Sequence, residues 1–132
     1  MTVFVDTSAL YALLDRDDTQ HQKAKSAFSG LLKKEELVTH SYVIVEAVAL
    51  TQRRLGSDAV RALVDELLPA IGTTIWVDEA AHRASMSALL AASPTDVSLV
   101  DQVSFHVMRE LGVSRAFAFD DDFRAAGFST LP

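Results

Sequence analysis

The chain of 132 residues is 49 % hydrophobic and 23 % charged, which excludes disorder, and its length is close to that of a common domain, so we expect one domain over residues 1–132. Twelve Lys and Arg against eighteen Asp and Glu give a net charge of −6, which argues against a polyanionic partner unless bound cations neutralise some of the acids. Cysteine is absent and no apolar run is long enough to cross a membrane, which excludes thiol and zinc–thiolate chemistry and predicts a cytoplasmic protein.

The first predicted strand ends in an acid. The run Val3–Val5 favours a strand and residues 9–14 (ALYALL) favour a helix, so Asp6 falls at a strand-to-helix turn. Two roles fit that position. Asp6 or Thr7 caps the helix by accepting backbone N–H bonds, or Asp6 points into the crevice at the carboxyl end of a parallel strand, where α/β sheets bind ligands.

Residues 15–72 contain three predicted helices and one predicted strand. The strand covers residues 36–40 (ELVTH), and the helices lie within the segments 15–34, 41–56 and 57–72. The expected caps and ends of these helices are, in chain order, Thr19, Ser41, Gly56, Ser57 or Asp58, and Pro69.

The second half of the chain repeats the same alternation. A strand over 73–78 precedes a helix over 79–92, and a helix over 98–112 precedes a strand over 114–120 and a short helix closed by Gly127. This order predicts an α/β fold in which a parallel sheet is flanked by helices.

Glu46 lies in an unusually apolar segment. Every other residue of YVIVEAVAL, residues 42–50, is apolar, so we expect a buried helix. A carboxylate inside such a helix is costly unless it meets a cation or a metal. A structural ion pair with an Arg of another helix is the alternative to a functional role.

Two more acids have apolar neighbours. Asp101 lies in SLVDQVSFHVM, where it also fits a capping box with Ser98. Asp120 repeats the position of Asp6, because AFAFD is a strand that ends in an acid. Together with Asp6 and Glu46, these acids predict a carboxylate cluster at the carboxyl edge of the sheet.

Such a cluster repels itself, so it either stays partly protonated or binds cations. Carboxylate oxygens suit Mg²⁺ or Mn²⁺, and a site of this kind is typical of phosphoryl chemistry. No serine lies in a G-x-S-x-G elbow, so Ser-His-Asp hydrolysis is unsupported. The histidines lack the spacing of metal ligands and are expected in packing or surface roles: His21, His40, His82 and His106.

The four acidic segments, in this order, resemble those of the PIN-domain ribonucleases, and in particular the VapC-like toxins of bacterial toxin–antitoxin pairs. The opening VFVDTSAL is similar to the first motif of that family, THSYVIVEAVAL to its TSSYV…E, SLVDQVSF to its SLTD…SF, and AFAFDDDF to its TFDxHF. The resemblance covers essentially the whole chain.

This resemblance implies a three-layer α/β/α sandwich and Mg²⁺- or Mn²⁺-dependent endonuclease cleavage of RNA. Carried over by position, Asp6, Glu46, Asp101 and Asp120 form the catalytic set, of which the three aspartates hold the metal, and Ser8 hydrogen-bonds nearby. It further implies a toxin that is inhibited when a cognate antitoxin peptide places Arg or Lys in the pocket, and a homodimer, which the high apolar content also favours.

The chain departs from the family pattern near two of the acids. Val100 stands where a hydroxyl is frequent, Ala118 where Thr is common, and Asp122 where His is often found. Within FDDDF we expect Asp120 to end its strand and enter the crevice, and Asp121 to face water. Asp122 is expected to cap the next helix or to reach a second metal.

Basic side chains supply the expected contacts to RNA phosphates. The first candidates are Arg53 and Arg54, and the others are Lys33, Lys34, Arg109 and Arg124. The alternative function is a catalytically weak RNA-binding or protein-interaction module on the same fold. A phosphotransfer receiver domain fits less well, because the chain has neither adjacent acids at its first strand nor a Lys after Lys34.

Overall fold

The computed structural model describes residues 1–132 and contains one sheet of five strands in the order β3-β2-β1-β4-β5, in which all neighbouring strands are parallel. The parallel sheet predicted from the sequence is confirmed. Its strands are β1 (Thr2–Val5), β2 (Glu36–His40), β3 (Gly72–Ile75), β4 (Arg115–Phe117) and β5 (Ser129–Leu131).

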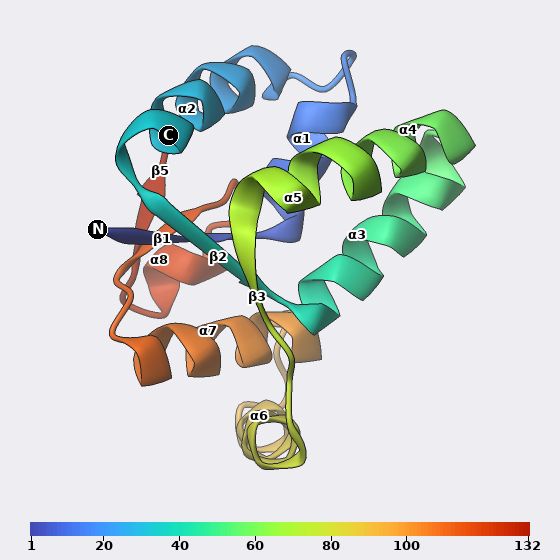
Figure 1. Ribbon diagram of the computed structural model, residues 1–132. Helices are drawn as coiled ribbons and strands as arrows, with labels where there is room; N and C mark the ends of the chain where they lie inside the picture. Colours follow the sequence, from blue (N-terminus) through green and yellow to red (C-terminus); the bar gives the residue numbers. More distant parts are fainter.

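Helices cover both faces of this sheet. Figure 1 shows α2 and α4–α5 on one side, α7 on the other, and α6 on the outer side of α7, which gives the three layers of an α/β/α sandwich. None of the helices combines the length and the apolar character needed to cross a membrane. The helical segments are α1 (Thr7–Leu14), α2 (His21–Lys34), α3 (Ser41–Arg54), α4 (Ser57–Ala62), the π-helical turn η1 (Leu63–Leu67), α5 (Leu68–Ile71), α6 (Glu79–Ala91), α7 (Leu99–Leu111) and α8 (Asp122–Ala125).

The central strand β1 is the most deeply buried. Val3, Phe4 and Val5 are all 0 % exposed, as expected of a parallel strand that has a neighbour on each edge and helices on each face. The Phe4 ring lies 5.5 Å from the His40 ring and 6.1 Å from the ring of Phe123. Packing of these rings joins β1 to the end of β2 and to α8.

The predicted ends of helices are confirmed where a glycine follows the helix. Gly56, Gly72 and Gly112 follow α3, α5 and α7 with φ of 92°, 88° and 68°, values that L side chains rarely adopt. Pro69 does not break its helix as expected. The chain passes through the π-helical turn η1, and Pro69 lies at the start of α5, where its missing N–H is tolerated.

The predicted N-caps of three helices, α2, α4 and α3, are wrong. Gln20, not Thr19, precedes α2, and it makes no side-chain cap bond. Gly56 precedes α4, so neither Ser57 nor Asp58 caps that helix.

At α3 the cap is a histidine in place of the expected Ser41. The ring Nδ1 of His40 accepts bonds from the N–H groups of Tyr42 and Val43, at 3.2 and 3.3 Å. The Ser41 hydroxyl accepts a bond from the N–H of Val77 and so ties α3 to the segment after β3.

Two strands end earlier than the sequence predicts, and one strand was not predicted. The last strand before the acidic run stops at Phe117, because the N–H of Phe119 donates to the Ser8 hydroxyl and not to a neighbouring strand. The strand before α6 stops at Ile75, and Trp76 is 75 % exposed. The edge strand β5 was missed because only three residues, two of them Ser and Thr, form it.

The cap at α3 yields a stability prediction. Replacing the buried His40 with Leu removes the acceptor of two N–H groups and should lower the free energy of unfolding by roughly 2–4 kcal/mol. Ser41→Ala removes one bond and should cost about 1 kcal/mol. Urea unfolding of the two variants measures this order, and a larger cost for Ser41→Ala would contradict the assigned cap.

Candidate functional site

The candidate site lies at the carboxyl ends of β1 and β4. These two strands are neighbours in the sheet, and the direction in which successive strands are added reverses between them. The N–H of Asp6 donates to the Phe117 carbonyl at 3.1 Å, which holds the ends of the two strands together. The Ser8 hydroxyl donates to the Asp6 carboxylate at 2.6 Å and accepts from the N–H of Phe119 at 3.0 Å. Ser8 therefore links the turn after β1 to the segment that carries Asp120.

Both roles considered for Asp6 apply at once. Its carboxylate caps α1 by accepting the N–H of Ser8 at 3.1 Å, and the side chain is buried, with 3 % exposed. Burial raises the pKa of Asp6 to about 6, against the lowering effect of the Ser8 bonds, and the charges of Glu46 and Asp120 raise it further. The cap thus fixes a carboxylate that other carboxylates face.

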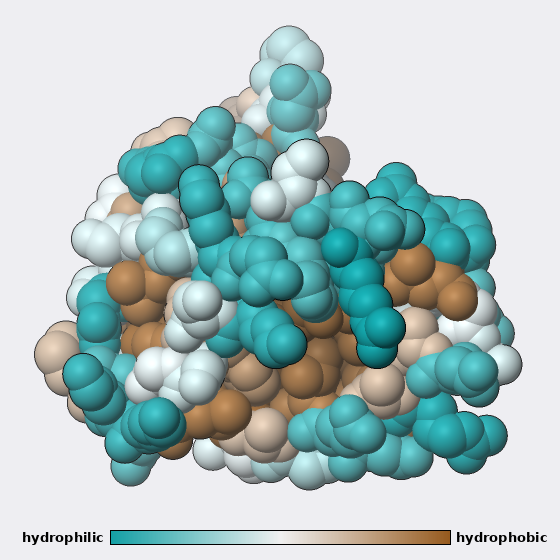
Figure 2. All heavy atoms as spheres, turned by 90° about the horizontal axis from the view of Figure 1, so that it is seen from above, coloured by the Kyte–Doolittle hydropathy of each residue, from teal (hydrophilic) through white to brown (hydrophobic).

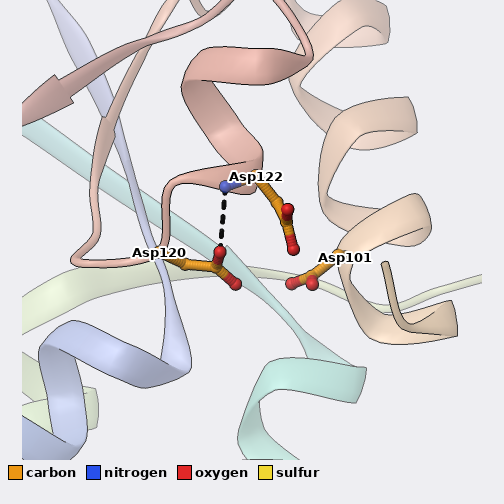
Figure 3. Close-up of side chains that lie close together, drawn as sticks. All are labelled: Asp101, Asp120 and Asp122. Atoms are coloured by element: carbon orange, nitrogen blue, oxygen red, sulfur yellow. Dashed lines mark hydrogen bonds between the residues drawn. The ribbon is translucent and has the colours of Figure 1, made fainter. Parts of the chain in front are cut away.

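Three aspartates form the tightest group of acids. Carboxylate oxygens of Asp101, Asp120 and Asp122 all lie within 4.8 Å of one another, and Figure 3 shows the three side chains pointing toward one another from α7 and the start of α8. The N–H of Asp122 donates to the Asp120 carboxylate at 2.9 Å, so Asp120 begins the turn that leads into α8. Asp121 points away, and its side chain is 84 % exposed beside Arg124.

Asp101 lies in the first turn of α7 and belongs to the cluster. Its N–H donates to the Ser98 hydroxyl at 3.1 Å, which is the N-cap half of the predicted capping box; the return contact, from the Ser98 N–H to the Asp101 carboxylate, does not reach full hydrogen-bond geometry. Burial, followed by the charges of Asp6 and Asp120, raises the pKa of Asp101 to about 7. The pKa of Asp122 is also raised, by burial and then by the charge of Asp120.

Glu46 lies on α3 and is not a member of the close group of aspartates. Its charge contributes to the raised pKa of Asp6 and of Asp101. The helix is not buried all round as expected, because Val45 is 68 % exposed and Ala49 is exposed too, and Glu46 itself is half-buried. The ion pair considered for Glu46 is absent.

No cation balances these acids. The ion pairs of the structure involve Glu35, Glu79 and Asp121, and none involves an acid of the pocket. In addition, the buried hydroxyl of Thr7, directly after Asp6, has no hydrogen-bond partner. A group of hard oxygen donors without a basic partner fits a divalent cation such as Mg²⁺ or Mn²⁺.

A buried histidine, missed as a site-supporting residue, positions α7. The Nε2 of His40 bonds the Ser104 hydroxyl at 2.8 Å, and that hydroxyl donates to the Val100 carbonyl at 3.0 Å, one residue before Asp101. Because Nδ1 accepts bonds from the α3 backbone, Nε2 carries the proton. Burial lowers the pKa of His40 to about 4, which keeps the ring neutral. The sequence feature that could have indicated this role is the position of the histidine at the end of a predicted strand, directly before a predicted helix.

Sequence and structure comparisons agree with this site. A family model described as PIN domain matches residues 3–129. The 23S rRNA-specific endonuclease VapC20 of Mycobacterium tuberculosis is 34 % identical over 126 residues, which cover 96 % of this chain and 95 % of the relative. The crystal structure of that VapC20, described as a sarcin–ricin loop cleaving toxin, superposes with a TM-score of 0.86 at 33 % identity over 96 % of this chain and 95 % of the other.

FitAcB from Neisseria gonorrhoeae superposes with a TM-score of 0.72 at 16 % identity, over 100 % of this chain and 97 % of the other, which shows the fold alone. The family model and the VapC20 relative, by contrast, both match along almost the whole chain. The chain therefore belongs to the PIN-domain family, as an endoribonuclease of the VapC type.

Proposed function

We propose that the acids at the carboxyl edge of the sheet hold Mg²⁺ or Mn²⁺ and cleave RNA phosphodiester bonds there. The observation that carries this proposal is the close approach of three aspartate carboxylates with no cation beside them. In the proposed site the metal-holding acids are Asp6, Asp101 and Asp120. Asp101 and Asp120 belong to the close group, whereas Asp6 lies outside it and is assigned by resemblance to the family. Glu46 completes the catalytic set, and Ser8 and Asp122, the third member of the close group, support these acids.

When bound, the metal would supply a Lewis acid for the phosphate and lower the pKa of a water molecule. The protein orients the ligands: Ser8 fixes one oxygen of Asp6, and the backbone of Asp122 fixes one oxygen of Asp120. Glu46, half-buried and without an ion pair, is free to accept a proton at the edge of the pocket. The raised pKa values of Asp6 and Asp101 mean that ligand binding and proton release are coupled.

The proposed substrate is ribosomal RNA. The support is the 34 % identity to a 23S rRNA-specific endonuclease along 96 % of this chain. Incubation of the purified protein with intact ribosomes, total rRNA and messenger RNA, with Mn²⁺ or with EDTA, tests this directly. A new end mapped in 23S rRNA that requires the metal is expected. Binding without cleavage under every metal condition would instead favour the weak RNA-binding module.

We further propose a cytoplasmic toxin that pairs with itself and with a cognate antitoxin peptide. Hydrophobic side chains reach the surface, with Trp76 75 %, Leu90 69 % and Val45 68 % exposed. Figure 2, which views the side of α2, α4 and α5, shows hydrophobic residues in the centre and toward both sides of the face, among mostly hydrophilic ones. An antitoxin that places Arg or Lys in the acidic pocket would supply the cation that the cluster lacks.

Light scattering at micromolar concentration tests whether the chain forms a homodimer. The expected mass is that of two chains of residues 1–132, each a single domain, because the exposed apolar side chains favour association. A mass of one chain would contradict the homodimer, and two separate unfolding transitions of the chain would contradict the single domain.

Alanine substitutions in the acidic run test the site. Asp120→Ala should lower cleavage by at least roughly 100-fold, since it removes a proposed ligand and the start of the α8 turn. Asp122→Ala should lower it by roughly 10-fold, and Asp121→Ala by less than about 2-fold because its side chain points into water. Cleavage rates and Mn²⁺ affinity should fall in the same order. An inactive Asp121 variant beside an active Asp120 variant would overturn the assignment.

The raised pKa of Asp101 predicts how stability changes with pH. In EDTA, Asp101→Asn and the parent should be about equally stable near pH 3, below the ordinary Asp pKa of 3.8, where the carboxyl is mostly protonated in both the folded and the unfolded chain. Between pH 4 and pH 7 the unfolded chain releases the proton first, so the parent loses stability as pH rises and the Asn variant does not. At pH 8 the variant should be more stable by roughly 1–2 kcal/mol, a value reduced for partial solvent screening.

Comparing the two proteins isolates this effect. The pKa of His40 is lowered, so its contribution to the stability of the protein is lost as pH falls from about 6.5 to 4. This loss is the same in both proteins. Urea unfolding at pH 3, 6 and 8 gives the difference. A difference that is constant over this range would show that Asp101 has an ordinary pKa. It would contradict the argument that burial beside other acids raises this pKa.

A further inference from the structure

A second hollow adjoins the acidic pocket at Asp120. It has a volume of about 600 Å³ and lies between the start of α2, the segment after β4, α8 and the end of β5. Figure 1 shows β5 and the C-terminus beside α2. Its polar lining residues are Gln20, Lys23, Asp120, Asp121, Arg124 and Thr130.

Two cations in this hollow are available to a ligand. Lys23 is exposed and takes part in none of the ion pairs of the structure. Arg124 pairs only with Asp121, which is itself exposed, and its other terminal nitrogen is 3.5 Å from the Thr130 hydroxyl. Exposed pairs of this kind contribute little energy, so a phosphate can replace the carboxylate at low cost.

The other main hollows lack this combination. The largest apolar one, between the segment after β3 and α7, contains Asp78 and Glu110 but no Lys or Arg. Those that contain a Lys or Arg contain no acid of the cluster. Only the hollow beside Asp120 therefore brings cations to the edge of the cleavage site.

Charge explains why such a subsite is needed. The chain carries a net charge of −6, and the acidic pocket can accept a phosphate only where a metal neutralises it. The phosphates on either side of the cleaved bond meet no metal, so they need basic side chains within one nucleotide of the acids. Lys23 and Arg124 stand at that position.

We propose that this hollow binds the nucleotide next to the cleaved bond, with Lys23 and Arg124 contacting its backbone phosphate. The inference rests on the proposed cleavage of RNA. Gln20 and Thr130 offer hydrogen bonds to a phosphate or a ribose hydroxyl, and the half-buried Phe119 offers a ring face to a base.

The same face of α2 extends the path. A smaller hollow of about 250 Å³ shares Pro132 with the first and is lined further along α2 by Ser26, Gly30 and Lys34. At 1.5 Å per residue, Lys23 and Lys34 are about 16 Å apart along the helix axis. An RNA strand that leaves the acids past Lys23 would run along α2 beside β5 toward Lys34.

Charge-matched variants test the subsite. Lys23→Gln and Arg124→Gln each remove one positive charge from the hollow, and Lys25→Gln removes one from the same helix two residues away, outside every main hollow. With an RNA oligonucleotide that the parent cleaves, the two subsite variants should raise KM by roughly 5- to 10-fold and change kcat by less than about 2-fold. Lys25→Gln should match the parent.

A binding measurement separates contact from structure. With Asp101→Asn as the background, the slope of log affinity against log salt should be smaller by about 0.7 for each subsite variant, which is the loss of one single-strand phosphate contact. Mn²⁺ affinity, measured for Lys23→Gln and Arg124→Gln with Asp101 intact, should not change, and Arg124→Lys should restore part of the RNA affinity.

The outcomes are distinguishable. If the parent neither binds nor cleaves any RNA, the proposed function fails. If the parent cleaves RNA and Lys23→Gln and Arg124→Gln behave as Lys25→Gln does, only the subsite is wrong. A variant that loses Mn²⁺ affinity together with RNA affinity would show that the hollow acts by supporting the acids and would overturn the contact.

Discussion

Burial of several carboxylates beside one another, without a basic partner, is the constraint on which the site depends. Burial raises the pKa values of Asp6, Asp101 and Asp122, and the charge of Asp120 raises each of them further. Such a group is unfavourable for folding in the charged state. The fold therefore has to hold each of these acids in place through its backbone elements.

The elements that do so are the apolar strands and a few buried polar bonds. The Phe123 ring, fully buried against Phe4 and Phe105, fixes α8 on the sheet and with it Asp120 and Asp122. On the other side, neutral His40 joins the ends of β2, α3 and α7. The acids are therefore carried by parts of the chain that hydrophobic burial orders, which is why the site can be rigid although its charges oppose one another.

Much of this was predictable from the sequence, and the rest was not for definite physical reasons. Asp6 and Glu46 stood out because charged residues rarely occur beside or within apolar runs. Hydrophobic patterns predicted four of the strands, and the alternation of strands with helices predicted that the sheet is parallel, but not the order of its strands. The cap at His40 depends on a ring nitrogen that only the tertiary fold makes an acceptor. The closeness of Asp122 to Asp101 depends on a tight turn after β4, and β5 is too short and polar to show a pattern.

The acidic pocket and its RNA substrate are both negatively charged, which explains why nearby basic residues matter. A protein with a net charge of −6 repels RNA at long range, so recognition depends on local fields near the cut. Arg54, a first candidate from sequence, stacks on Tyr11 with its guanidinium 5.6 Å from the ring, whereas Lys23 lies in the hollow that includes Asp120. A cation in that hollow acts on a phosphate at a range shorter than the screening length of physiological salt, about 8 Å, where its field is least reduced. Proximity to the acids, more than the number of basic residues, therefore decides which cations can position the RNA.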